Sequence, residues 1–242
     1  MKKNWLIGAA AVLATGLPGA ALADTNGHVK FTYASLDEEG DPDKESAIGL
    51  SGAVVSDVGS GWRLQFNGAG ASMDHTGHND DFSQFEAHAI YGFDSFSLGA
   101  FTGHFNQTGT GFWEFGAEAG ITFGQFGFTG SASTLTATSD GGDDGSNLGL
   151  NGYFNVTENI SISGHGSWTD FGFDDEVDSY GIGAHFAFGN GLGVGIGWRT
   201  SDFDTAETDT IGVSLNWNFG EGDHHRMLPG AMGLIPDAVA SQ

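Results

Sequence analysis

Residues 210–219 read Thr-Ile-Gly-Val-Ser-Leu-Asn-Trp-Asn-Phe, and this stretch decides the class of fold. Every second residue is apolar, namely Ile211, Val213, Leu215, Trp217 and Phe219. The residues between them are Thr, Gly, Ser or Asn. A strict period of two residues predicts a β-strand with one apolar face and one face of small or polar side chains.

The same alternation recurs along most of the chain. It predicts twelve strands, at roughly 26–35, 46–56, 61–71, 82–93, 95–105, 111–123, 126–136, 146–156, 159–169, 178–188, 190–200 and 208–219. Most are about ten residues long, which is the length that a tilted strand needs to cross a bilayer. The segment 95–105 is less regular, because Phe101 and Phe105 fall on the face opposite its other apolar residues.

The connections between these segments alternate between short turns and longer polar loops. The longer ones cover roughly 36–45, 74–81, 106–111, 138–145, 170–177 and 201–207, and they hold most of the acidic side chains. Short turns at one end and long loops at the other are typical of outer-membrane barrels. We therefore predict an all-β fold, a single antiparallel transmembrane β-barrel of about 12 strands over residues 24–219, with short periplasmic turns and acidic extracellular loops.

The composition excludes several classes of function. The 242 residues include 42 Gly, no Cys, and 31 acidic against 7 basic side chains. Without Cys there is no disulfide framework, thiolate metal site or Cys nucleophile. A net charge of −24 argues against a nucleic-acid partner, because phosphate binding needs a patch of Lys and Arg. No P-loop, dinucleotide or hydrolase fingerprint occurs, so we expect no cofactor, no metal site and no enzymatic activity.

The two ends of the chain differ from the region between them. Residues 1–23 have the features of a secretory signal peptide, with Lys2 and Lys3 before a short apolar stretch and an Ala-Leu-Ala cleavage site at 21–23. Residues 220–242 follow the last predicted strand, and we expect them to form a C-terminal periplasmic tail. A luminal plug or a docking peptide is the alternative for this tail.

Aromatic residues gather near the ends of the predicted strands. Two aromatic belts at the membrane interfaces are typical of a membrane barrel and unnecessary in a soluble sandwich. We expect an aromatic girdle formed by Trp62, Phe93, Phe123, Phe154, Trp198, Trp217 and Phe219.

The last three predicted strands resemble those of the Gram-negative outer-membrane porin superfamily, in the style of a small alphaproteobacterial porin. The resemblance rests on residues 180–189, the Asn190-Gly191 turn, 192–198 and the closing strand 211–219, which ends in an aromatic residue like the assembly signal of such barrels. It implies insertion by the barrel-assembly machinery through the closing strand. The connection at 106–111 is too short for the constriction loop of sixteen-stranded porins, and Phe219 does not end the chain.

The face opposite the apolar one would line the interior of the barrel. We expect the pore-lining residues to include Lys30, Arg63, Glu86, His88, Glu114, Glu118, His165, His185 and Arg199. Lys30 and Arg199 lie on the first and eleventh predicted strands, and the carboxylates lie on the fourth and sixth. This spacing predicts a transverse field, with basic groups on one wall and acidic groups on the other.

These features together predict a porin-like outer-membrane channel of a Gram-negative bacterium. It would allow passive diffusion of ions or small hydrophilic solutes and favour cations, because the acidic loops repel anions. The expected partners are outer-membrane lipid and lipopolysaccharide, small solutes, and divalent cations at the acidic loops. The alternative is a non-conducting structural or adhesive barrel.

An outer-membrane lipid hydrolase is a further alternative. His165 and Ser167 have the H-x-S spacing that places a base and a nucleophile on one strand face, and Asn151 and Asn155 share the predicted face of the neighbouring strand. This set resembles the His/Ser/Asn arrangement of outer-membrane phospholipase. In that family the site faces lipid, whereas the alternation here predicts an interior position.

Overall fold

The computed structural model describes residues 25–38, 45–75, 78–107, 110–138, 144–172, 176–203 and 206–220. Within them lie twelve strands: β1 (Thr25–Glu38), β2 (Glu45–Gly59), β3 (Trp62–His75), β4 (His78–Phe93), β5 (Phe96–Gln107), β6 (Thr110–Phe123), β7 (Phe126–Ala137), β8 (Gly145–Thr157), β9 (Ile160–Asp170), β10 (Glu176–Ala187), β11 (Leu192–Phe203) and β12 (Ala206–Phe219). All twelve predicted strands are confirmed, and most extend a few residues further. The signal peptide 1–23 and the tail after Gly220 lie outside the described residues.

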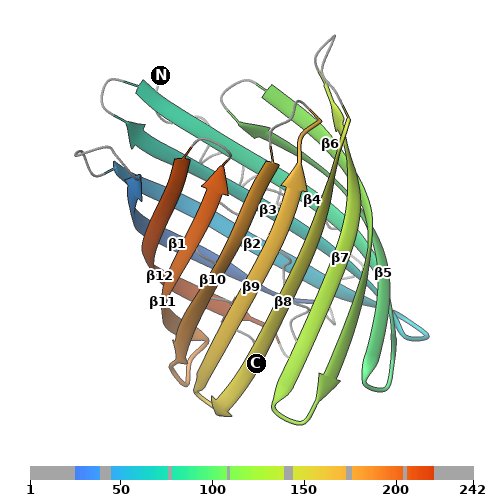
Figure 1. Ribbon diagram of the computed structural model, residues 1–242. Coiled ribbons are helices and arrows are strands. Elements are labelled where there is room, and N and C mark those ends of the chain that lie inside the picture. Colours follow the sequence, from blue (N-terminus) through green and yellow to red (C-terminus); the bar gives the residue numbers. More distant parts are fainter. Residues whose placement is uncertain are drawn as a thin grey trace.

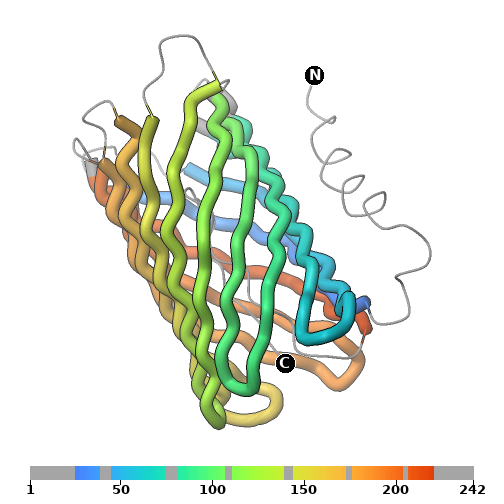
Figure 2. Tube along the Cα trace, turned by 90° about the vertical axis from the view of Figure 1, so that its right-hand side faces the viewer, coloured from blue at the N-terminus to red at the C-terminus, as the bar shows by residue number. Residues whose placement is uncertain are grey.

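The strands form one closed antiparallel barrel in chain order (Figure 1). Each strand pairs with its sequence neighbours, and β1 closes the barrel on β12 with Gly27 opposite Phe219 and Glu38 opposite Thr208. Figures 1 and 2 show from two sides that the strands are strongly tilted against the barrel axis. Closure pairs both edge strands, so the predicted fold class is confirmed.

Side chains alternate between the two faces of the sheet as the sequence pattern predicts. In β12, Ile211, Val213, Leu215 and Trp217 are each more than half exposed, whereas Thr210, Ser214 and Asn216 are less than a tenth exposed. The apolar face therefore points outward and the small polar face points into the barrel. A soluble protein would bury the first set, and a bilayer covers it with hydrocarbon.

Short turns join the strands at one end of the barrel, which we call the short-turn end. They contain Ser60-Gly61, Asp94-Ser95, Gly124-Gln125, Glu158-Asn159 and the residues around Asn190-Gly191. Gly191 has a φ of 80° and even Asp94 has a φ of 49°, so these turns use the left-handed region that tight hairpins require. The opposite end, where the predicted acidic loops begin, is the long-connection end.

The interior near the long-connection end is apolar on one side of the barrel. Ala71, Phe82, Phe105, Phe112 and Leu135 form a buried cluster on β3–β7. The rings of Phe105 and Phe112 stack with centroids 5.2 Å apart, and Phe171 packs against Phe112 at 5.5 Å. The irregular alternation at 95–105 thus has a physical cause, because Phe101 and Phe105 point inward while Phe96 and Leu98 point outward.

Among the described residues, no helix is long and apolar enough to cross a membrane.

Candidate functional site

All nine residues predicted to line the pore lie at inward-facing strand positions. Arg63 and His165 are partly buried and the other seven are less than a tenth exposed, namely Lys30, Glu86, His88, Glu114, Glu118, His185 and Arg199. They come from seven strands: β1, β3, β4, β6, β9, β10 and β11. Their role in conduction stays a prediction, but their arrangement can be described in detail.

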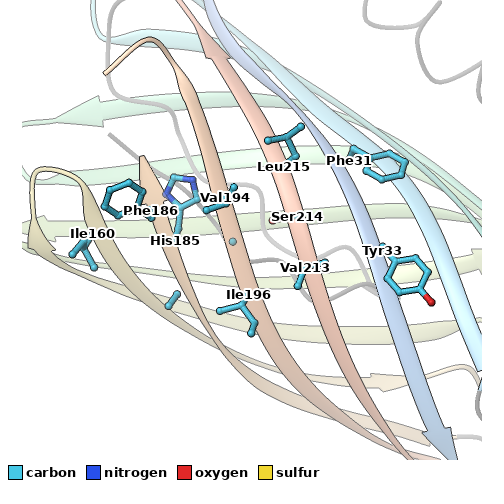
Figure 3. Close-up of a pocket in the computed structure, with 12 residues that line it drawn as sticks. Phe31, Tyr33, Ile160, His185, Phe186, Val194, Ile196, Val213, Ser214 and Leu215 are labelled. Carbon is cyan, nitrogen blue, oxygen red and sulfur yellow. The ribbon is translucent and has the colours of Figure 1, made fainter. Parts of the chain in front are cut away.

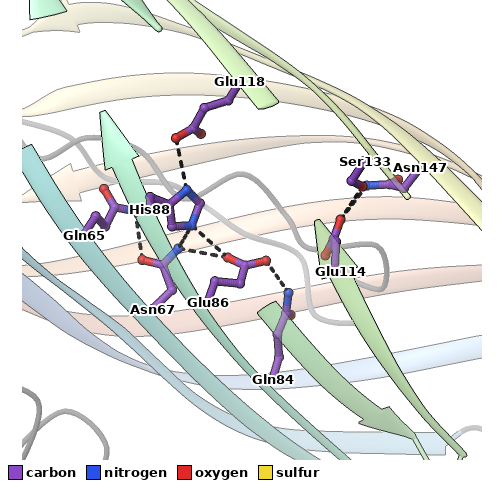
Figure 4. Close-up of polar contacts among 9 residues, drawn as sticks. All are labelled: Gln65, Asn67, Gln84, Glu86, His88, Glu114, Glu118, Ser133 and Asn147. Atoms are coloured by element: carbon purple, nitrogen blue, oxygen red, sulfur yellow. Dashed lines mark hydrogen bonds and ion pairs between the residues drawn. The ribbon is translucent and has the colours of Figure 1, made fainter. Parts of the chain in front are cut away.

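His88 joins two carboxylates on the inner wall of β4–β6. Its Nδ1 lies 3.0 Å from Glu118 Oε1, and its Nε2 lies 3.3 Å from Glu86 Oε2 (Figure 4). Both ring nitrogens therefore lie near a carboxylate, and Nε2 also lies 2.9 Å from the Asn67 side-chain amide nitrogen. Asn67 donates to Glu86 Oε2 at 2.9 Å, and Gln84 donates to Glu86 Oε1 at 2.6 Å. The sequence did not reveal this bridge, which we call the His88 bridge.

Glycine residues on β5 allow the His88 bridge to form across that strand. Glu86 is on β4 and Glu118 is on β6, so their side chains must meet over the inward face of β5. A Cβ atom at Gly99 would lie 2.6 Å from Glu118 Oε1, and one at Gly103 would lie 2.8 Å from Glu86 Cγ. The ring of Phe101, between these two glycines, stacks on His88 with centroids 5.2 Å apart. A side chain at either glycine would fill the space that the carboxylates use.

Glu114 has a separate set of partners on the same side of the barrel (Figure 4). Its Oε1 accepts hydrogen bonds from Ser133 Oγ at 2.5 Å and from Asn147 Nδ2 at 3.4 Å. Thr169 Oγ1 in turn donates to Asn147 Oδ1 at 3.0 Å. These hydrogen bonds connect β6, β7, β8 and β9 next to the apolar cluster.

Basic side chains lie on the opposite part of the wall. Lys30 is on β1 and Arg199 is on β11, on either side of β12. In a closed ring of twelve strands, β6 is the strand directly opposite β12, so Glu114 and Glu118 face the two basic groups across the interior. His185 on β10 lies over Gly193 and its Nε2 is 2.8 Å from Asn216 Oδ1. Lys30 and Arg199 thus lie opposite the carboxylates of β6, whereas Arg63 on β3 lies next to β4 and the buried Glu45 on β2 lies next to β1.

The predicted girdle residues all lie on the outer face or at the strand ends. Trp62, Phe93, Phe123, Trp198 and Trp217 are between 37% and 52% exposed. Phe154 and Phe219 are partly buried, because Phe154 stacks on Phe126 at 4.6 Å and Phe219 packs on Trp217 at 5.5 Å. Their positions suit the predicted interfacial role, which stays a prediction.

The outer surface has a shallow apolar hollow over β9–β12 and β1 (Figure 3). Its volume is about 590 Å³, and its walls include Phe31, Tyr33, Val194, Ile196 and Val213. These side chains face away from the barrel interior. Most of the lining is apolar, as on a lipid-facing surface, and His185 and Ser214 from the inward face also contribute to it.

The hydrolase alternative rests on the His165–Ser167 pair. Both residues are on the inward face of β9, as the alternation predicts. His165 Nε2 has no hydrogen-bond partner, so this nitrogen does not bind the Ser167 hydroxyl. Within the described part of the chain, no group of three or more His, Asp and Glu side chains could hold a metal ion.

Comparison with known proteins gives matches at the level of fold. No protein-family model matches the chain, and no curated protein sequence matches it. Among solved structures, the KdgM porin has a TM-score of 0.55 at 9% identity, covering 78% of this chain and 99% of that one. An outer-membrane channel from Pseudomonas putida F1 has a TM-score of 0.56 at 13% identity, covering 84% and 99%. The translocator domain of the autotransporter NalP from Neisseria meningitidis has a TM-score of 0.54 at 11% identity, covering 89% and 95%.

The chain therefore has the fold of outer-membrane, porin-like barrels. Its structural neighbours include porins and channels. The identities are too low to assign a solute, and the match to a translocator domain means that the fold alone does not fix the activity.

Proposed function

We propose that this protein is a porin-like channel of the Gram-negative outer membrane for passive diffusion of ions or small hydrophilic solutes, favouring cations. The observation that carries the proposal is the division of charge inside the barrel. Glu86, Glu114 and Glu118 lie on β4 and β6, and Lys30 and Arg199 lie on β1 and β11. Walls of opposite charge act on permeating ions and set their selectivity.

The size of the interior supports the same proposal. Twelve strands place the barrel between small barrels filled by side chains and sixteen-stranded porins with an aqueous channel. Small residues occupy the inward face of β8–β12, and in β11 they are Gly193, Gly195 and Gly197. The space over Gly193 is filled by the His185 ring.

The test is single-channel conductance of the refolded protein in planar bilayers. Under a salt gradient, the reversal potential of the wild type should indicate preference for K⁺ over Cl⁻. Glu118→Gln removes a negative charge and should lower this preference, whereas Lys30→Gln removes a positive charge and should raise it. Ile182→Val, on the lipid-facing side of β10, is the matched control and should change neither. Unchanged selectivity in both charge variants would contradict the transverse field.

A closed barrel is the second candidate, and one observation favours it. Gln65, Ile90 and Leu135 point inward, yet each is 0% exposed, so water does not reach these side chains. Such packing suits a structural or adhesive barrel. The same bilayer experiment separates the two candidates, since a folded barrel of this kind would give no conductance steps.

The remaining assignments belong to the same proposal. Export would use residues 1–23, and assembly would use the closing strand β12 with its terminal Phe219. The acidic loops would bind divalent cations that bridge to lipopolysaccharide. The alphaproteobacterial character rests on the resemblance of β10–β12 alone.

A further inference from the structure

The inner wall formed by β8–β12 has an excess of buried polar atoms without a hydrogen-bond partner. Among them are Asn151 Nδ2, Ser161 Oγ, His165 Nε2, Arg199 Nε, Ser214 Oγ and Asn216 Nδ2. Buried polar atoms are normally paired, so each exception needs an explanation. Most of these atoms can donate a hydrogen bond, so this wall could bind a group that accepts hydrogen bonds.

Three of these residues lie in one row across the strands. Asn151 on β8 pairs with His165 on β9, His165 pairs with Gly181 on β10, and Gly181 pairs with Arg199 on β11. Neighbouring strands are about 4.8 Å apart, so the backbones at His165 and Arg199 are separated by roughly 10 Å with only a glycine between them. A Cβ atom at Gly181 would lie 2.9 Å from His165 Nε2. The imidazole therefore lies over Gly181, on the side toward Arg199.

Arg199 has no counter-charge on its own wall. Its side chain is 3% exposed, and its Nε has no hydrogen-bond partner among the described residues. The inward positions of β8–β12 contain no Asp or Glu. A buried charge in a protein is normally paired or bound to a ligand, and the inward positions of β8–β12 offer Arg199 no anion.

We propose that Asn151, His165 and Arg199 form an oxyanion-binding subsite that takes the carboxylate or phosphate group of a small solute. The planar guanidinium binds two oxygens of such a group in parallel. His165 donates from Nε2 in the tautomer protonated there, and the Asn151 amide donates from Nδ2. Access for a solute rests on the channel function proposed above, whereas the subsite itself rests only on these side chains.

Calorimetric titration of the folded full chain in detergent tests the proposal, with acetate and inorganic phosphate as probes at constant ionic strength. Saturable binding is expected for the wild type. Arg199→Gln and His165→Gln should weaken it about tenfold or more, because each removes a hydrogen bond to a charged group. Arg199→Lys keeps the positive charge but loses the paired donors of the guanidinium. Its affinity should therefore fall between those of the wild type and Arg199→Gln. Binding of only one probe identifies the group that the subsite prefers.

The control is His104→Gln, on β5, where the imidazole packs against Phe85 and Trp113 outside this wall. It should bind both probes as the wild type does. The proposal is overturned if the wild type shows no saturable binding, if Arg199→Gln binds unchanged, or if His104→Gln loses as much affinity as His165→Gln. Heat-modifiable gel mobility verifies that each variant is folded.

Calorimetry needs no conductance, so the two proposals can fail separately. Protein that binds acetate or phosphate but gives no conductance in bilayers would retain the subsite and lose the channel function. Protein that conducts but binds neither probe would retain the channel function and lose the subsite.

Discussion

Removal of His88 should destabilise the barrel by about 3–5 kcal/mol, because it leaves a buried ion pair with one partner missing. His88→Ala deletes contacts of 3.0 Å to Glu118 and 3.3 Å to Glu86. Glu86 keeps its hydrogen bonds from Asn67 and Gln84, so the larger part of the loss falls on the contact with Glu118. A hydrogen bond to a charged group contributes about 1.5–3 kcal/mol.

A double-mutant cycle separates this contact from the cavity that the alanine leaves. In a Glu118→Gln background, His88→Ala should cost about 1.5–3 kcal/mol less than in the wild type, because the charge-assisted bond is already absent. The measurement is equilibrium unfolding in guanidinium chloride, with the barrel in detergent and tryptophan fluorescence as the signal. His104→Ala is the control and should cost about 1 kcal/mol through lost ring contacts.

Two results would refute this reasoning. If His88→Ala lowers the free energy of unfolding by less than about 1 kcal/mol, the two carboxylates do not depend on the imidazole. If the cycle is additive within about 0.5 kcal/mol, His88 and Glu118 are not coupled in the folded barrel.

Three further predictions concern packing on each side of the sheet. Gly103→Ala would place a Cβ atom 2.8 Å from a backbone carbonyl of β4 and should lower the free energy of unfolding by about 1–3 kcal/mol. At Gly130 the nearest atom to such a Cβ would be 3.8 Å away, so Gly130→Ala should be close to neutral in the same unfolding assay. Phe105→Ala should lower the free energy of unfolding by about 3–5 kcal/mol because this ring is fully buried. Phe115 is 54% exposed on the lipid side, so Phe115→Ala should cost clearly less. Equal losses would contradict the packing of Phe105 in the interior cluster. Val213→Arg places a charge on the lipid-facing side of β12 and should cost about 2–4 kcal/mol in lipid vesicles, and a neutral result would contradict the outward assignment of this face.

The fold could be predicted because its signal is repeated in every strand. A period of two fixes which side chains point outward, and it excludes pairings shifted by one residue, which would turn the apolar face inward. The number of strands and the inward position of residues such as Lys30, Glu118 and Arg199 follow from the same alternation. The predicted strand ends were less accurate, because strand pairing extends beyond the apolar residues at either end. β4, for example, begins at His78 and not near 82.

The contacts inside the barrel could not be predicted to the same extent. Alternation places Glu86 and Glu118 on the inner face, but it does not give the stagger between β4 and β6. That stagger puts His88 between the two carboxylates, and it depends on the pairing of both strands with β5. One signal was present in the sequence, since Gly99 and Gly103 flank an inward Phe101 and leave two open positions on one strand face. Without the register, their partners could not be identified.

The positions of the large side chains inside the barrel indicate which strands should determine selectivity. Large inward side chains are concentrated on β3–β7, where Phe82, Phe105 and Phe112 pack together and the His88 bridge fills the wall below them. The inward residues of β8–β12 are mostly Gly, Ser, Asn and Thr. In the channel proposed above, a solute would therefore pass closer to β8–β12 than to the centre of the barrel. Substitutions at Arg199 should alter its passage more than equivalent charge changes at Glu114, whose Oε1 is already held by two hydrogen bonds.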